Sequence, residues 1–243
     1  MKPRDIAELL ALAALWGGSF LFMRMGAAEF GAFALAGLRV GGAALALLPV
    51  ILLRGEWPAL RRHWGPIFLV GITNSALPFL AFSYAALTLP AGLSSILNAA
   101  TPLFGALIAW LWLGDRLNRW RSAGLVVGFV GVVGLILAKS APQAGGGSPA
   151  LLASLACVGA AVCYGFSASF AKRFLHGVPP FAVAGGSQLS AALALAVPTL
   201  LSWPATPPSA QSWWAVALLA LLSTAVAYVL FFDLLKQIGP ANA

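Results

Sequence analysis

The stretch Trp64–Gly114, WGPIFLVGITNSALPFLAFSYAALTLPAGLSSILNAATPLFGALIAWLWLG, contains no charged residue and no histidine over 51 consecutive positions. A helix needs about 20 apolar residues to cross the ~30 Å hydrocarbon core of a bilayer, so this stretch is too long for one crossing. Thr88–Gly92, TLPAG, divides it, because proline and glycine end helices. The stretch therefore predicts two transmembrane helices joined by a tight turn, which is typical of a multi-pass membrane protein.

The rest of the chain extends this pattern. Hydrophobic residues make up 61% of the 243 positions and charged residues 8%, with a mean hydropathy of +0.94. A soluble core of this size could not bury so much apolar surface, whereas a bilayer can. We therefore predict an all-α membrane protein with about eight transmembrane helices. Their expected ranges are 6–25, 33–53, 66–87, 92–113, 122–138, 150–171, 180–202 and 212–236.

Lysine and arginine gather in every second connection between these helices. Cytoplasmic loops favour both residues, so the asymmetry predicts a cytoplasmic N-terminus and an inner (plasma) membrane location. Only Arg24 and Lys139 fall in outer loops, and Arg39 lies inside a helix. The other eleven of the fourteen are Lys2, Arg4, Arg54, Arg61, Arg62, Arg116, Arg119, Arg121, Lys172, Arg173 and Lys236.

The net charge of +8 would suggest a nucleic-acid partner if it covered one soluble face. Here it is distributed over cytoplasmic loops, where it sets topology and contacts lipid headgroups, so no nucleic-acid partner is expected. Lys2 and Arg4 before an apolar run would also suit a signal peptide. The alternating charge pattern is best satisfied when this segment remains as the first helix.

The two parts of the chain resemble each other. A Gly-rich linker, 139–149, separates a first repeat of five helices, 1–138, from a second repeat, 150–243. Because five is an odd number, the second repeat would be inverted in the membrane, as in alternating-access transporters. Shifts of 148 to 150 residues align Trp16-Gly17-x-Ser19 with Tyr164-Gly165-x-Ser167, Thr73-Asn74 with Ser223-Thr224, and Pro90-Ala91 with Pro240-Ala241.

The repeat predicts more helices than the chain contains. Partners for the helices in 92–138 would occupy about 242–288, whereas the sequence ends at Ala243. We therefore expect a fragment that ends before helices nine and ten, with an eight-helix variant as the alternative.

In its short motifs the chain resembles the EamA-type members of the drug/metabolite transporter superfamily. The carrying motifs are Leu15-Trp16-Gly17-Gly18-Ser19-Phe20, Leu38-Arg39, Ala99-Ala100-Thr101-Pro102-Leu103-Phe104 and Leu111-Trp112-Leu113-Gly114-Asp115-Arg116-Leu117, followed by the glycines of the fifth helix. Asp115 stands where the family usually has Glu, a departure that keeps the carboxylate. The resemblance implies ten helices, a central substrate path between helices 1–4 and 6–9, and export of small molecules more often than import.

Arg39 is the most specific single candidate for a functional residue. It lies about two turns into the second helix, where a charge is costly unless it faces water or a partner. It could line the substrate path and attract a carboxylate or phosphate. Alternatively, it could extend to the outer headgroups, or pair with Glu29 or a backbone carbonyl.

Polar and aromatic residues at membrane depth are further candidates for the substrate path, because such groups face protein or a watery cavity rather than lipid. The alternative is hydrogen bonding between helices, worth about 0.6 kcal/mol each on average. With Arg39, the candidates are Trp16, Ser19, Asn74, Asn98, Thr101, Tyr164, Ser167, Gln188, Thr224 and Tyr228.

Two carboxylates and three prolines could serve the transport cycle. Asp233 could couple transport to protons or simply pair with Lys236. Glu8 is a second coupling candidate, although it lies only a turn inside the membrane. Prolines free a backbone carbonyl and permit bending, so they could be gating hinges or fixed kinks. These prolines are Pro78, Pro102 and Pro198.

The sequence contains no metal-binding or nucleophile motif and no pair of mid-membrane carboxylates, so we expect that the protein has no cofactor and no metal, and that it is not an enzyme.

The fifth helix carries Gly124, Gly128, Gly131 and Gly134, a spacing that allows close helix packing within the chain or in a homodimer. The predicted function is export of small amphipathic metabolites, such as amino acids or drugs, by alternating access. The alternative is a non-transporting membrane protein, such as an assembly partner or a lipid-handling protein.

Overall fold

The computed structural model describes residues 3–115, 118–140 and 147–238. In this part of the chain all regular structure is helical, which confirms the all-α prediction. The α-helices are α1 (Pro3–Leu53), α2 (Trp57–Arg62), α3 (Trp64–Gly71), α4 (Leu77–Ala85), α5 (Ala91–Asn98), α6 (Thr101–Ile108), α7 (Arg119–Ser140), α8 (Gly147–Phe174), α9 (Pro180–Leu201), α10 (Ala210–Ala220) and α11 (Ala227–Ile238). Three π-helical segments join some of them: η1 (Ile72–Ala76), η2 (Ala109–Leu113) and η3 (Leu221–Val226).

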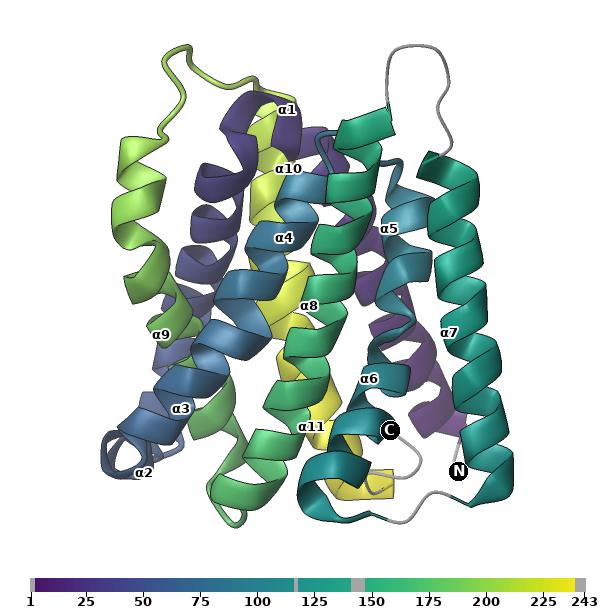
Figure 1. The fold of residues 1–243 in the computed structure, drawn as a ribbon. Helices are drawn as coiled ribbons and strands as arrows, with labels where there is room; N and C mark the ends of the chain where they lie inside the picture. Colours follow the sequence, from purple (N-terminus) through teal and green to yellow (C-terminus); the bar gives the residue numbers. More distant parts are fainter. Residues whose placement is uncertain (1–2, 116–117, 141–146, 239–243) are drawn as a thin grey trace.

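Seven helical segments of the described chain are long and apolar enough to cross a membrane. The first of them, α1, has 51 residues, which would make a straight helix about 76 Å long. It is not straight, because Gly31 adopts φ 71° and ψ 175° and the chain reverses there (Figure 1). The two limbs of α1 correspond to the first two predicted helices. No separate loop divides them, since a single glycine in a left-handed conformation is sufficient for the reversal.

The helix predicted over 92–113 is also discontinuous. α5 ends at Asn98, the backbone turns at Ala99 and Ala100, and α6 begins at Thr101 with Pro102 in its first turn. Proline has no N–H to donate and fixes φ at a helical value, so it fits a helix start better than a helix interior. The break therefore coincides with Pro102.

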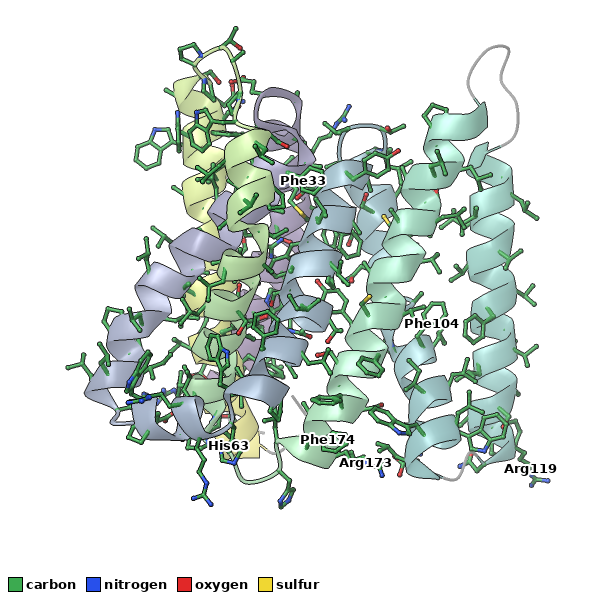
Figure 2. The ribbon with its side chains drawn as sticks, turned by 60° about the vertical axis from the view of Figure 1, so that its left-hand side comes forward. Phe33, His63, Phe104, Arg119, Arg173 and Phe174 are labelled. Carbon is green, nitrogen blue, oxygen red and sulfur yellow. The ribbon has the colours of Figure 1, made fainter. Side chains whose placement is uncertain are left out.

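The basic connections lie at one end of the bundle. Figure 2 shows His63, Arg119 and Arg173 at the same end, although His63 lies between α2 and α3, Arg119 in α7 and Arg173 in α8. α1 begins and α11 ends at this end as well (Figure 1). We call it the basic end, and its gathering of arginines agrees with the charge alternation of the sequence.

Close backbone approach holds the bundle together at several helix crossings. α1 packs along α9 and α10, while α4 and α6 pack on α8. At Gly165 in α8, an added Cβ would lie 2.7 Å from the backbone nitrogen of Gly105 in α6. The outer surface is apolar, with Leu45, Val127 and Leu201 more than 70% exposed, as a surface facing lipid requires.

Candidate functional site

A cavity of about 500 Å³ lies inside the helical bundle. Its volume is in the range of small-molecule binding sites. Residues from both limbs of α1 line it, together with residues of α3, α4, α5, α6, α8, α9, α11 and the π-helices η1 and η3. Ten of the eleven predicted substrate-path residues are among them: Trp16, Ser19, Arg39, Asn74, Asn98, Thr101, Tyr164, Ser167, Thr224 and Tyr228.

Arg39 supplies the charge of the described lining. Its side chain is 5% exposed, and its guanidinium lies over the ring of Phe79, with Cζ 3.7 Å from the ring centroid. Nε donates to Thr224 Oγ1 at 3.1 Å, and Nη1 points to Met23 Sδ at 3.5 Å. Arg39 therefore neither extends to the headgroups nor pairs with Glu29, which instead accepts hydrogen bonds from Ser209.

A polar network surrounds the hydroxyl of Tyr228. Asn74 Nδ2 donates to this oxygen at 3.3 Å and Gln188 Nε2 at 3.4 Å. Gln188 also donates to Ser75 Oγ at 2.7 Å. Gln188, the eleventh candidate, thus does not line the cavity but is fully buried behind it. Its amide positions the Tyr228 hydroxyl at the cavity wall.

Aromatic rings form the apolar walls. The ring of Trp16 lies 5.5 Å from that of Phe231, and Phe82 stacks on Tyr164 at 6.3 Å. Phe20 meets Phe82 edge to face at 5.3 Å. Such ring clusters offer flat apolar surfaces and hydroxyl groups at the same site, which suits a ligand with an apolar body and a polar end.

Two π-helices bring short polar side chains to the cavity. η1 places Asn74 in the lining, with Ser75 behind it against Gln188, and η3 places Ser223 and Thr224 in the lining. The wider turn of a π-helix is frequent at functional sites. Thr224 Oγ1 donates to the carbonyl of Leu219, five residues earlier, so its lone pairs are free to accept from Arg39. The sequence offers no sign of these π-helices, because their residue pattern also suits an α-helix.

Several lining residues were not among the sequence candidates. Phe79 and Met23 contact the guanidinium, and Ser223 contributes a buried hydroxyl without a partner in the described structure. Phe79 and Phe82 are three residues apart and share a helix face, which is the one signal that could have identified them. Ser187, which the shift of 148 residues aligns with Arg39, also lines the cavity.

The predicted coupling carboxylates lie apart from these lining residues or outside the described side chains. Glu8 accepts from Arg4 Nε at 2.7 Å near the start of α1 and does not line the cavity. Asp233 lies in α11, but its side chain and that of Lys236 are outside the described residues.

The three predicted hinge prolines occupy different places. Pro78 is near the start of α4, directly after η1, and Pro102 is near the start of α6. Pro198 lies in the last turn of α9, three residues before its end. Pro78 follows the change from π-helix to α-helix, and Pro102 follows the break between α5 and α6. A bend at Pro198 would change the direction of only the last residues of α9.

The described cavity residues can bind a ligand that has polar and apolar parts. Hydroxyls, amides, phenols and one guanidinium can hold a polar ligand, and the rings can cover its apolar part. Among the described residues no cluster of histidine, cysteine and carboxylate side chains could hold a metal ion.

Comparison with known proteins identifies the family. The model of the EamA-like transporter family matches residues 6–137 and again 151–243. The uncharacterized transporter YvbV of Bacillus subtilis (strain 168) is 28% identical over 173 residues, which cover 71% of this chain and 55% of YvbV. The chain thus matches little more than half the length of that relative.

Other relatives align over more of their length. The uncharacterized inner membrane transporter YedA of Escherichia coli (strain K12) is 24% identical over 97% of this chain and 75% of its own. One solved crystal structure shares the fold, with a TM-score of 0.66 and 24% identity over 94% of this chain and 77% of that chain. Because the two family matches together cover most of the sequence, the chain belongs to the EamA-like transporter family.

Proposed function

We propose that this protein exports small amphipathic metabolites across the inner membrane by alternating access, as a secondary transporter or facilitator. The observation that carries the proposal is the cavity of about 500 Å³, enclosed by membrane-crossing helices and lined by aromatic rings and polar groups. A bundle needed only for anchoring would gain stability by filling this space with apolar side chains.

The proposed repeat supports alternating access. The family model matches twice, once on each side of the linker, and the cavity lies between helices of both parts. The π-helices η1 and η3 are related by nearly the same shift as the aligned motifs. We propose that these π-helices, with the neighbouring Pro78 and the break at Pro102, absorb the bending when one bundle rocks against the other. The hinge role of Pro198 stays a prediction.

Orientation and assembly are part of the proposal. The basic end would face the cytoplasm, since positively charged loops stay on that side. A homodimer would form through α7, whose Gly124, Gly131 and Gly134 leave open space beside their backbone. Gly128 faces Leu103 of α6 instead, so internal packing uses at least one of the four glycines.

Flux measurements on reconstituted vesicles test the function. The purified protein is reconstituted, the vesicles are loaded with amino acids, drugs and nucleosides, and release is followed with and without a pH gradient. Saturable release of a solute is the expected result. A stimulation by the pH gradient would direct attention to Asp233 and Glu8 as coupling groups.

A matched pair of tryptophan variants connects flux to the cavity. Ala168→Trp adds a large ring at an exposed position of the lining and should abolish release. Leu45→Trp adds a similar ring on the lipid-facing surface and should not. Well-folded protein that releases no solute saturably across the whole panel would contradict transport and favour the non-transporting alternative.

A further inference from the structure

Arg39 is a buried cation whose described contacts are all neutral. Thr224 offers a hydroxyl, Met23 a thioether and Phe79 a ring. Ion pairs of the described side chains, such as Arg4 with Glu8 and Lys172 with Asp115, lie elsewhere. The described lining of the cavity contains no carboxylate to neutralise the guanidinium.

An ionised group inside a membrane protein is costly when it has no counter-charge, because water is largely excluded there. The guanidinium has five N–H donors, of which the contacts with Thr224 and Met23 use two. Its planar fork matches a carboxylate, which it can bind through two parallel hydrogen bonds. A ligand that brings one negative charge would therefore supply what the described protein residues around Arg39 do not.

The remaining lining defines the rest of that ligand. Trp16, Phe82 and Tyr164 present rings toward a space the size of a small metabolite. These walls suit an aromatic or branched apolar body. A primary ammonium group would find no anionic partner among the described lining residues, and Arg39 would repel it. Charge and shape thus favour an anion over a cation, and over a zwitterion of the same size.

We propose that the cavity binds monoanionic carboxylates with an apolar, preferably aromatic, body, with the carboxylate on Arg39 and the ring among Trp16, Phe82 and Tyr164. This inference rests on the proposed function and narrows its substrate class. A single carboxylate neutralises a single guanidinium. A dianionic phosphate ester would leave a net negative charge in the same apolar space.

Binding to a matched series of compounds tests the inference without requiring transport. The probes are 3-phenylpropanoate, phenylalanine and 2-phenylethylamine, which share a phenyl ring and carry an anionic, a zwitterionic and a cationic end. Phenyl phosphate adds the dianion. Equilibrium dialysis of each radiolabelled compound against the purified protein gives its Kd. The carboxylate should bind more tightly than the zwitterion and the phosphate, and the cation should bind least.

Variants assign the preference to one side chain. Arg39→Gln removes the charge and should weaken binding of 3-phenylpropanoate by about tenfold to a hundredfold, the worth of charge-assisted hydrogen bonds. Arg39→Lys keeps the charge but loses the planar fork of donors, so its Kd for 3-phenylpropanoate should lie between those of the wild type and Arg39→Gln. Arg61→Gln makes the same charge change on the exposed surface of α2 and should leave the Kd unaltered.

The Kd values of the four compounds for the wild-type protein test the preference for a monoanion even if Arg39→Gln fails to fold. Equal binding of the anion and the cation, no binding of 3-phenylpropanoate, or an unchanged Kd in well-folded Arg39→Gln would each overturn the assignment. Failure of the proposed function has a different signature, since it appears as absent flux across the whole solute panel. Saturable flux of a cation that survives Arg39→Gln would refute the carboxylate site and leave transport standing.

Discussion

Nε of Arg39 donates to Oγ1 of Thr224 at 3.1 Å, across 185 positions of the sequence. The bond joins the second limb of α1 to the π-helix η3 inside the bundle. Thr224 can accept it because its own proton is donated to the carbonyl of Leu219 at 2.9 Å. One hydroxyl therefore holds both the π-helical turn and the orientation of the cavity cation.

Replacing Thr224 by valine should destabilise the protein. The change keeps the shape of the side chain but leaves the Nε donor of buried Arg39 without its acceptor, which costs about 1–3 kcal/mol. Ser223→Ala is the matched control in the same π-helix. The Ser223 hydroxyl is buried and has no partner in the described structure, so its removal should be neutral or slightly stabilising. Thermal unfolding in detergent compares the two, and an equal loss in both variants would contradict this role of Thr224.

Gly165→Ala should separate α8 from α6. The new Cβ would lie 2.7–2.8 Å from backbone atoms of Phe104 and Gly105, and backbone cannot move aside as a flexible side chain can. Overpacking of this kind costs about 1–3 kcal/mol. Gly17, its counterpart in the aligned motif, has nothing within 4 Å of the same added atom. Gly17→Ala should thus keep or raise the Tm, and a larger loss at Gly17 than at Gly165 would disprove the packing argument.

The hydroxyl of Tyr228 should matter more than that of another tyrosine. Tyr228→Phe removes the acceptor of Asn74 and Gln188 and should lower stability by about 1–2 kcal/mol. Tyr84→Phe makes the same change at a side chain that is 38% exposed, where an effect within about 0.5 kcal/mol is expected. The Tm values of both variants, measured together, check the prediction. It is wrong if the two substitutions are equivalent.

Ser209 should secure the end of the bundle opposite the basic end. Its Oγ caps α10 by accepting from the N–H of Ser212 and donates to Glu29 Oε1 at 2.8 Å. Ser209→Ala should cost about 1 kcal/mol through loss of the cap. Ser202→Ala, at the exposed end of α9, is the control and should leave the Tm unaltered. If adding Glu29→Gln lowers the Tm as much in Ser209→Ala as in wild type, the two side chains are not coupled.

The main features of the fold could be predicted from the sequence. Each of the eight predicted spans overlaps a helical segment of the structure, and the basic connections lie at one end. Hydropathy and loop charge carry this information because the bilayer imposes one length and one polarity rule on every crossing. The reversal at Gly31 and the break at Ala99–Ala100 differ from the expected boundaries, since single residues are sufficient to turn the chain there.

The candidate residues of the cavity could also be named from their type. A polar or charged side chain at membrane depth must face protein or water, so Arg39, Asn98 and Tyr228 stand out in an apolar sequence. Ten of the eleven selected on this basis line the cavity. Gln188 also avoids lipid, but it faces protein rather than the cavity. Its amide nitrogen donates to the side chains of Ser75 and Tyr228.

The partners of these residues were decided only by the tertiary structure. Whether Arg39 meets Glu29, a carbonyl, Phe79 or Thr224 depends on how α1, α4 and η3 cross. The π-helices depend on packing in the same way, since a shift in hydrogen-bond register leaves no mark in residue type. The sequence alone determined which segments cross the membrane and which side chains lipid would exclude. The arrangement of the helices, set by close contacts such as Gly165 on Gly105, decided which of those side chains meet, because contact energies depend on distances that no local pattern specifies.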